Sequence, residues 1–337
     1  MGVDKISACS NPRRLSALAM CVYNGVRYLQ EQLDSIAQQT VSLDQIVIVD
    51  DKSNDGSWDL LQAWVASCGL NVTLVRNDHN LGFVRNFEKA STLVDADIVF
   101  FADQDDIWQS DKVARILRLF DDPKVVLAHS DADLINEEGA RLGRRLFATL
   151  LLRNEERELV RSGRAAAVYL KRNLVTGAAC AVRRELLKHA LPFPQSHGWS
   201  HDEWLALAAG VTGSVAMLEE PTMSYRLHGS NTIGIPITDW RWRLETIACG
   251  IFSPQRQALE RRLERLNILR ERCIQWQPPV WFLQDIDSVL EHIAHRLSLS
   301  ANPLRRIQPV LREWRARRYN VWSNGELSVI HDILLAN

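Results

Sequence analysis

In its first third the chain reads Ala96-Asp97-Ile98-Val99-Phe100-Phe101-Ala102-Asp103-Gln104-Asp105-Asp106-Ile107-Trp108. The apolar part, Ile98–Ala102, has the β-branched and aromatic composition of a strand that is buried on both faces, as in a parallel sheet. The chain then leaves the sheet at its carboxyl edge, which is where open α/β folds bind their ligands. At this edge it places three carboxylates within four residues.

These three acids, Asp103, Asp105 and Asp106, have two interpretations. Carboxylates this close repel one another and lose hydration, so they need a cation or strong hydrogen-bond donors nearby. Oxygen ligands of this kind suit Mg²⁺ or Mn²⁺, which share phosphate oxygens with a substrate. The alternative is a solvated acidic turn that caps a helix starting near Asp111.

Composition limits the classes of function. The chain has 337 residues, of which 46% are apolar and 24% charged, with a formal net charge of -1. This balance excludes a nucleic-acid binder that works by bulk charge. Six scattered cysteines without metal-ligand spacing favour free thiols in a reducing compartment. With no apolar run long enough to span a bilayer and no signal-peptide pattern, we expect a cytoplasmic protein, soluble or attached peripherally to the inner face of the membrane.

Strand and helix patterns alternate at short intervals over residues 15–130. Strands are expected at Leu15–Tyr23, Ile46–Val49, Val72–Val75 and Ile98–Ala102. This alternation predicts a parallel, doubly wound sheet with right-handed crossovers. Asp50 and Asp51 end the second strand, so they would meet the acids of the fourth strand at one edge of the sheet. Since there is no Gly-rich phosphate loop, a diphosphate bound there would need a metal, which favours the metal interpretation.

Four ordered blocks at family spacing carry a resemblance to a known family. The blocks are Ala19–Gly25, Val49–Ser57, Asn80–Asn86 and Asp103–Asp106. They resemble the nucleotide-binding half of inverting family 2 glycosyltransferases of the GT-A type, and the Asp-Gln-Asp-Asp-Ile-Trp form is most similar to bacterial rhamnosyltransferases. The resemblance implies an α/β fold with a GT-A, Rossmann-like, mixed and mostly parallel sheet flanked by helices, with a helical C-terminal appendage. It also implies a nucleoside-diphosphate sugar donor and a divalent cation, Mg²⁺ or Mn²⁺.

The resemblance further assigns roles to residues at the sheet edge. It implies that Asp50 or Asp51 contacts the base or ribose, and that Arg85 approaches the base or phosphates. The full set of donor-binding residues that it implies is Tyr23, Asn24, Asp50, Asp51, Arg85, Asp103 and Gln104. Arg85 could equally be a surface charge of a helix. Asp55, within the second block, is expected to cap a turn or helix.

Two further residues complete the implied site. Asp202 and Glu203 open an apolar helix, where the helix dipole stabilises carboxylates, and simple N-terminal capping would explain the pair. An inverting transfer needs a general base, however, and Asp202 fits the family's position for it better than Glu203. His228 lies in a Gly/Ser/Asn turn, and a neutral imidazole is an acceptable Mn²⁺ ligand. By resemblance the metal ligands are Asp103, Asp105 and His228.

The remaining chain divides into regions of different character. We expect a lead-in at residues 1–14, a catalytic domain at 15–238 and a helical region at 239–337. The catalytic domain would comprise the nucleotide-binding half 15–130 and an acceptor and catalytic half 131–238. Within the latter, Asp131 and Asp133 are expected to be structural and Asn136–Gly139 to form a hairpin tip. Residues 141–172 have the pattern of a solvated helical insert.

Residues 240–337 carry 15 Arg, 10 acidic residues and no Lys, with six Trp spread among the arginines. Two interpretations are open. The segment could place an amphipathic helix on an anionic membrane. It could instead pack its tryptophans onto the catalytic domain or onto a second subunit of a homodimer, since Arg and Trp are also favoured at protein interfaces.

We therefore predict transfer of a sugar to a hydroxyl of a surface glycan or lipid-linked saccharide acceptor. By resemblance the donor is dTDP-L-rhamnose, or alternatively a UDP-sugar, and the anomeric carbon is inverted. Two alternatives remain: a nucleotidyltransferase, which would normally show a Gly-rich phosphate loop that Cys21–Gly25 lacks, and a non-catalytic nucleotide-binding scaffold protein. No nucleic-acid partner is expected.

Overall fold

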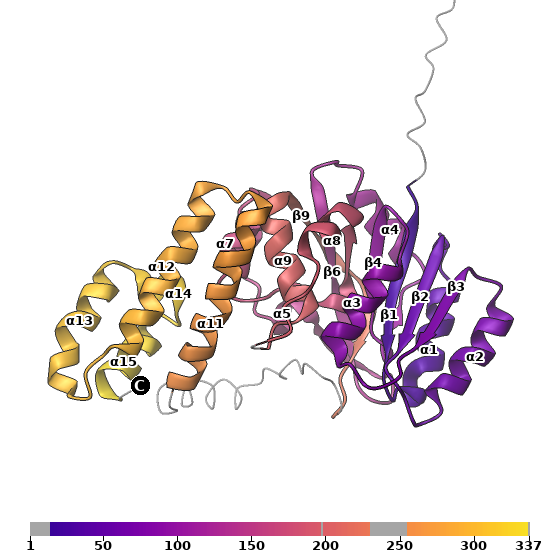
Figure 1. Ribbon diagram of the computed structural model, residues 1–337, viewed down its shortest axis with the longest axis horizontal. Coiled ribbons are helices and arrows are strands. Elements are labelled where there is room, and N and C mark those ends of the chain that lie inside the picture. Colours follow the sequence, from indigo (N-terminus) through magenta and orange to yellow (C-terminus); the bar gives the residue numbers. More distant parts are fainter. Residues whose placement is uncertain (1–13, 197, 230–254, 336–337) are drawn as a thin grey trace, which may run out of the picture.

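The computed structural model of the chain describes residues 14–196, 198–229 and 255–335. Figure 1 shows an elongated molecule with a β-sheet and its flanking helices at one end and a group of helices at the other. The strands are β1 (Ser16–Val22), β2 (Gln45–Asp50), β3 (Val72–Arg76), β4 (Ile98–Ala102), β5 (Ile107–Trp108), β6 (Val125–Ile135), β7 (Arg141–Arg145), β8 (Cys180–Arg183) and β9 (Ser214–Arg226). They form one sheet in the order β3-β2-β1-β4-β8-β6-β9-β5, with β7 paired to β6.

Helices accompany the sheet and extend beyond it. Those of the sheet half are α1 (Val26–Ala37), α2 (Ser57–Cys68), α3 (Phe83–Leu93), α4 (Lys112–Leu119), α5 (Leu146–Thr149), α6 (Asn154–Arg161), α7 (Ala165–Tyr169), the 3₁₀ turn η1 (Gly177–Ala179), α8 (Arg184–Ala190) and α9 (His201–Thr212). Those of the other end are α11 (Arg256–Arg272), the 3₁₀ turn η2 (Cys273–Trp276), α12 (Val280–Leu297), α13 (Pro303–Arg315), α14 (Arg318–Trp322) and α15 (Glu326–Leu334).

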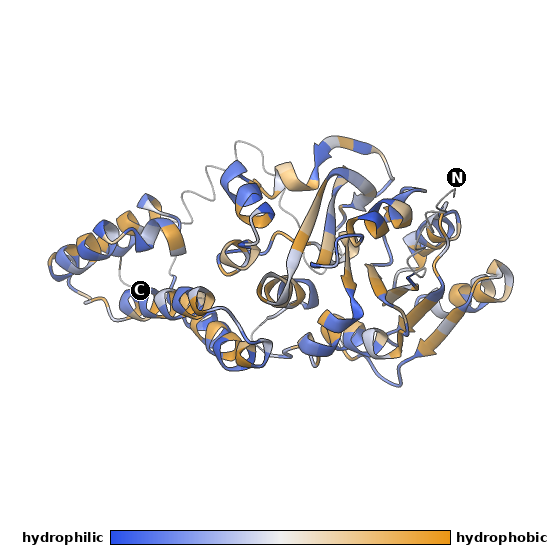
Figure 2. Cartoon of the chain, turned by 90° about the horizontal axis from the view of Figure 1, so that it is seen from above, coloured by the Kyte–Doolittle hydropathy of each residue, from blue (hydrophilic) through white to orange (hydrophobic). Residues whose placement is uncertain are grey.

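The first half of the sheet is parallel, as predicted. Strands β3, β2, β1 and β4 pair in parallel, and every residue of β1 and of β4 is buried. Alternate residues of β1 enter two different cores: Ala19 packs in the core that contains Phe87 of α3, and Met20 in the core that contains Leu29 of α1. Burial on both faces explains why these strands are continuous apolar runs, which Figure 2 shows in the hydrophobic colour.

The second half of the sheet mixes directions. Strand β8 runs antiparallel to both β4 and β6, β5 runs antiparallel to β9, and β6 runs parallel to β9. The predicted mixed sheet with helices on its faces and helices at the C-terminal end is confirmed. Most parallel pairings lie in the half of the sheet that contains β2 and β4, the two strands that the acidic residues follow. Because these strands are parallel, the carboxyl ends of β1, β2 and β4 lie at one edge of the sheet.

The prediction for residues 141–172 is partly wrong. Arg141–Arg145 form strand β7 on β6, and the predicted hairpin tip at Asn136–Gly139 lies between the two strands. Helix α7 is not solvated, because Ala165, Ala166 and Tyr169 are buried in the core that also contains α9. In the sequence, the many Arg and Glu residues of this region outnumber the few apolar residues of α7, so its short apolar face was not predicted.

Asp131 has a structural role, as expected. Its Oδ1 accepts hydrogen bonds from the backbone N–H groups of Ala132 (2.9 Å) and Phe147 (2.8 Å). The expectation of free thiols also holds for the described cysteines, since Cys21, Cys68, Cys180 and Cys273 form no disulfide.

Tryptophan contacts join the C-terminal helices to the sheet half. Trp276 packs edge-on against Trp204 of α9 with ring centroids 5.0 Å apart, and its Nε1 donates to the carbonyl of His189 (2.9 Å). Trp322 is also buried, whereas Trp314 is 40% exposed. Packing on the sheet half therefore accounts for Trp276, while Trp240 and Trp242 lie outside the described residues. Among the described helices, none is both long enough and apolar enough to cross a membrane.

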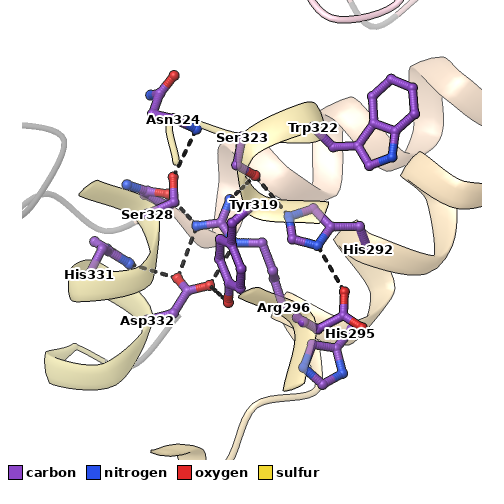
Figure 3. Close-up of polar contacts among 12 residues, drawn as sticks. His292, His295, Arg296, Tyr319, Trp322, Ser323, Asn324, Ser328, His331 and Asp332 are labelled. Atoms are coloured by element: carbon purple, nitrogen blue, oxygen red, sulfur yellow. Dashed lines mark hydrogen bonds and ion pairs between the residues drawn. The ribbon is translucent and has the colours of Figure 1, made fainter. Parts of the chain in front are cut away.

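A buried polar network holds helices α12, α14 and α15 together (Figure 3). Arg296 donates to both oxygens of Asp332 (2.7 and 2.9 Å), which also accepts from Tyr319 Oη (2.7 Å). Nearby, His292 contacts Glu313 and Ser323 through its two ring nitrogens. Because the charges are paired and hydrogen-bonded, their burial is tolerated.

Candidate active site

The acidic residues that follow β2 and β4 lie close enough together to shift the pKa of the same neighbouring side chains. The thiol of Cys21, near the end of β1, has its pKa raised by burial and by the negative charges of Asp103 and Asp51. The Gln104 side chain spans from the β4 end to the β1 end, accepting from Tyr23 N (2.7 Å) and donating to Tyr23 O (2.9 Å). The structure thus brings the ends of β1, β2 and β4 to one place, as the parallel pairing requires.

Asp105 and His228 meet although 123 positions separate them. His228 Nε2 lies 2.7 Å from Asp105 Oδ2. The imidazole stacks on Tyr28 of α1, with ring centroids 4.8 Å apart. Arg226 lies over the same tyrosine ring at 4.7 Å, and its Nε donates to the carbonyl of Asp105 (2.8 Å). The end of β9 and helix α1 therefore fix both partners of this pair.

Asp103 lies in a strongly negative environment. Burial raises its pKa to about 7, and the charges of Asp105 and Asp202 add to the increase. Tyr225 of β9 has its pKa raised by burial and by all four nearby carboxylates, those of Asp103, Asp105, Asp106 and Asp202. Asp202 of α9 thus lies within electrostatic reach of the acids that end β4.

Asp106 and Lys112 are buried at this edge of the sheet, beneath the other acidic residues. Asp106 Oδ1 accepts from the backbone N–H of Arg226 (3.0 Å), and burial followed by the charges of Asp105 and Asp103 raises its pKa. Lys112 Nζ donates to the carbonyl of Ala178 (2.6 Å) and lies 4.1 Å from the centroid of the Trp108 ring. Burial lowers the pKa of Lys112 to about 7. This lysine opens α4, and its only signal in the sequence is a charge on the helix face that also carries Val113 and Ile116.

Asp202 is held rigidly at the start of α9. Its Oδ2 accepts from the backbone N–H of Gly177 (3.1 Å), and its Oδ1 accepts from the N–H of Glu203 (2.7 Å) and from the Ser200 hydroxyl. The N-cap of α9 is Ser200, which makes no side-chain cap hydrogen bond, so Asp202 is not the helix cap and satisfies one free N–H of the first turn, that of Glu203. These hydrogen bonds do not exclude proton transfer, because each carboxylate oxygen has more than one lone pair.

Gly177 is required where it stands. A Cβ there would lie 2.6 Å from His201 Nε2. The His201 ring is buried and stacks on Phe87 with ring centroids 3.9 Å apart, so it has little freedom to move. This close approach lets the backbone N–H of Gly177 donate its hydrogen bond to Asp202.

Several predicted donor-binding residues already have protein partners. Asp51 accepts from Asn77 Nδ2 (2.7 Å) and from the backbone N–H groups of Leu81 (2.7 Å) and Gly82 (2.9 Å). This arrangement ties the Asn80–Asn86 block to the end of β2. Any contact of Asp51 with a nucleotide would use its remaining lone pairs.

The other donor-side residues are similarly placed. Asp50 is buried and paired with Arg76 Nε (3.2 Å). Asn24 Oδ1 accepts from Asn54 N (2.9 Å), and Asp55 accepts from Val26 N (3.0 Å), which confirms the expected turn role of Asp55. Arg85 is exposed on α3 and donates to Gln195 Oε1 (3.2 Å).

The oxygen and nitrogen atoms available as metal ligands around Asp105 suit a hard or borderline cation. Within the described ranges, no three His, Cys, Asp or Glu side chains are gathered closely enough to form a ready metal cage. The Asp105–His228 pair supplies one carboxylate and one imidazole side by side. A cation held by so few protein ligands would take its other oxygens from water and a diphosphate, as Mg²⁺ and Mn²⁺ do.

The mixed sheet and its acidic strand ends agree with the family that the four sequence blocks resemble. Comparison with known proteins supports the assignment, since the family description "Glycosyl transferase family 2" matches residues 17–191. The chain belongs to glycosyltransferase family 2. In fold it is similar to Staphylococcus aureus TarS residues 1–349, solved in complex with UDP-GlcNAc, with a TM-score of 0.52 and 16% identity over 94% of this chain and 90% of that one.

Relatives found by sequence match a smaller part of the chain at higher identity. An uncharacterized glycosyltransferase of Nostoc sp. (strain PCC 7120) is 27% identical over 220 residues, which are 62% of this chain and 63% of the relative. The O-antigen chain rhamnosyltransferase RfbN of Salmonella typhimurium is 32% identical over 126 residues, 34% of this chain and 38% of the relative. The match thus spans less than two thirds of either relative.

Three residues of the site escaped sequence reasoning. Tyr28, Tyr225 and Arg226 surround the acids, yet each lies in an ordinary helix or strand pattern. Arg226 stands two residues before the predicted ligand His228, but its partner at Asp105 is 121 positions away. Only the fold reveals such long-range partners.

Proposed function

We propose that this chain transfers a sugar from a nucleoside-diphosphate donor to an acceptor hydroxyl, with a divalent cation and with inversion at the anomeric carbon. The observation that carries the proposal is the Asp105–His228 contact of 2.7 Å, with Asp103 and Asp202 close enough to influence each other's charge. Asp105 and His228, which are already in contact, would hold the cation, and Asp103, within electrostatic reach of Asp105, stays a predicted third ligand. When bound, the cation would neutralise the departing diphosphate.

Asp202 would act as the general base. Three hydrogen bonds fix its carboxylate, so one oxygen can be presented to an acceptor hydroxyl in a constant direction. Asp51, Asp50, Tyr23, Asn24 and Gln104 would form the edge against which the nucleotide lies. Lys112, whose pKa is lowered to about 7, would compensate the acids while it is protonated.

The donor and acceptor are proposed from similarity. L-rhamnose from dTDP-rhamnose is supported by the Asp-Gln-Asp-Asp-Ile-Trp motif and by the partial similarity to RfbN. UDP-GlcNAc, bound in the TarS structure, makes a UDP-sugar the other donor to test. The acceptor would be a saccharide of a surface glycan or a lipid-linked saccharide at the cytoplasmic face.

A panel of nucleotide-sugars, each with and without EDTA, tests the proposal by release of free nucleoside diphosphate. We expect release from dTDP-rhamnose or a UDP-sugar that EDTA abolishes and Mn²⁺ or Mg²⁺ restores. Asp105→Asn and Asp202→Asn should each reduce release at least 100-fold, roughly what loss of a general base costs. Asp59→Asn, at an exposed carboxylate of α2, is the matched control and should keep normal turnover. Normal turnover in either site variant removes that residue from the mechanism.

A further inference from the structure

A separate pocket lies between α7, α9 and α11. Figure 1 shows these three helices where the C-terminal helices meet the sheet half. Its volume is about 480 Å³. Glu203 lines it from α9, one residue along from Asp202. The pocket is not part of the proposed donor site, because none of the residues that line it belongs to the acids that end β2 and β4.

The charges around this pocket are unbalanced. Its lining contains four cationic side chains, those of Lys171, Arg261, Arg262 and Arg265, and a single carboxylate, that of Glu203. Arg265 is bonded to Glu203 and therefore neutralises it. Three positive charges are left without a carboxylate in the lining.

Three residues of the lining also carry buried hydrogen-bond donors that have no partner in the described chain. Tyr169 Oη, Trp199 Nε1 and one terminal nitrogen of Arg262 are buried without a hydrogen-bond partner in the described chain. The first two side chains are only 2% and 4% exposed. Burial raises the pKa of Tyr169, so its hydroxyl stays protonated and can donate. Buried polar groups are normally paired, so a set of unpaired donors at one cavity indicates a missing acceptor.

Arg262 shows the electrostatic cost of leaving the pocket without an anion. Burial lowers its pKa to about 10, and the neighbouring charges of Arg296 and Arg265 lower it further. One of its nitrogens donates to the carbonyl of Trp322 (2.9 Å) and the other has no partner. An anion beside the free nitrogen would relieve both the repulsion and the unpaired donor.

We propose that this pocket binds a phosphate-bearing ligand through Arg261, Arg262, Tyr169 and Trp199. Phosphate offers several acceptor oxygens and no donor, and guanidinium groups match its geometry with paired hydrogen bonds. A lone carboxylate would balance only one of three positive charges, whereas a diphosphate balances two or three. If the proposed function holds, a phosphate group of the acceptor bound here would lie beside the helix turn that carries Asp202.

Titration calorimetry with sodium pyrophosphate in EDTA tests the proposal on the full chain. EDTA removes the cation that a diphosphate needs at Asp105 and His228. We expect the wild type to bind pyrophosphate, and the double variant Arg261→Gln/Arg262→Gln to bind at least tenfold more weakly. Arg305→Gln, at an exposed arginine of α13, is the matched control and should bind as the wild type does.

A second variant separates binding from folding, because Arg262 also supports the carbonyl of Trp322. Arg261 is exposed and makes no ion pair in the described chain, so Arg261→Gln should leave the thermal unfolding temperature unchanged and weaken pyrophosphate binding at least threefold. If the wild type binds neither pyrophosphate nor vesicles that contain phosphatidic acid, or if the wild type and the double variant bind them equally, the proposal is overturned.

Further arms identify the source of the phosphate. Inorganic phosphate and pyrophosphate represent a soluble ligand, and phosphatidylcholine vesicles with and without phosphatidic acid represent a lipid headgroup. Arginine-dependent binding of vesicles that contain phosphatidic acid would assign the pocket to a lipid phosphate, and binding of pyrophosphate alone to a soluble or acceptor-borne one. Asp105→Asn should bind pyrophosphate normally in EDTA, so failure of the donor site and failure of this pocket give different results.

Discussion

Asp103 links the candidate metal site to pH. Its pKa in the metal-free protein is raised to about 7, chiefly by burial and further by Asp105 and Asp202. A cation must displace this proton, so affinity for Mn²⁺ should fall as the pH drops below about 7 and approach a plateau above it. Calorimetry at about pH 6 and about pH 8 should give roughly tenfold weaker binding at the lower pH, with proton release. Equal affinity at both values would show that Asp103 does not bind the cation as a carboxylate.

Gly177 offers a test of how precisely Asp202 must be held. In Gly177→Ala the new Cβ would meet His201 Nε2 at 2.6 Å, and Phe87 blocks the retreat of that ring. Displacement of the 177 backbone would weaken its hydrogen bond to Asp202. We expect at least a tenfold loss of sugar transfer, the scale of a misplaced catalytic group, with donor binding largely kept. Unchanged kcat measured with unchanged thermal unfolding would contradict a positioning role for this glycine.

Sequence reasoning at this scale selected residues that meet in the fold where they sit in a short recognisable block, and their role as metal ligands stays a prediction. Asp105 and His228 were both predicted, and the structure brings them together. It failed for Lys112, whose bonded carbonyl at Ala178 is 66 positions away and whose charge stands among apolar neighbours. A buried lysine cannot be told from a surface lysine until the fold defines what covers it.

At the scale of elements, the contact between η2 and α9 stabilises the packing of the C-terminal helices on the sheet half. Trp276 is 5% exposed, packs on Trp204 and donates to His189. Trp276→Ala should therefore cost about 3–5 kcal/mol of unfolding free energy, as for other buried aromatic truncations. Urea denaturation measures this loss, and limited proteolysis should show earlier cleavage around α11.

The matched control for that change is Trp314→Ala on α13, since Trp314 is 40% exposed. A surface substitution of this kind should change the unfolding free energy by no more than about 0.5 kcal/mol. If the two variants lost equal stability, the contact of Trp276 with α9 would not be what joins the helices to the sheet half.

Elements were predicted well where local pattern and tertiary environment agree. The predicted Ile98–Ala102 strand matches β4 to the residue, because a strand buried on both faces needs an apolar run. Strand β9, Ser214–Arg226, was not among the predicted strands. Its second half contains Pro221 and polar residues and continues only because β6 pairs with it through register shifts. Local pattern carries no sign of such a partner.

At the scale of the whole molecule, buried titratable groups make the fold sensitive to acid. Burial lowers the pKa of His292 to about 4 within the network of Figure 3. In the same network, Asp332 is buried, which would raise its pKa, but the hydrogen bond and charge of Arg296 lower it overall. An acid with a lowered pKa stabilises the fold above its unfolded pKa and loses that contribution as the pH falls. Both groups therefore make the native state less stable, relative to the unfolded chain, as the pH falls.

His129 gives this sensitivity a specific test in the sheet. Burial lowers its pKa from 6.5 to about 4, and neither ring nitrogen has a hydrogen-bond partner among the described residues. The unfolded chain takes up the proton near pH 6.5 and the native protein only near pH 4, so stability should fall as the pH decreases between these values. His129→Leu removes the group and should remove roughly 3 kcal/mol of that pH-dependent loss. Urea denaturation of both proteins across this range measures it, and parallel curves for the two would mean that His129 does not contribute.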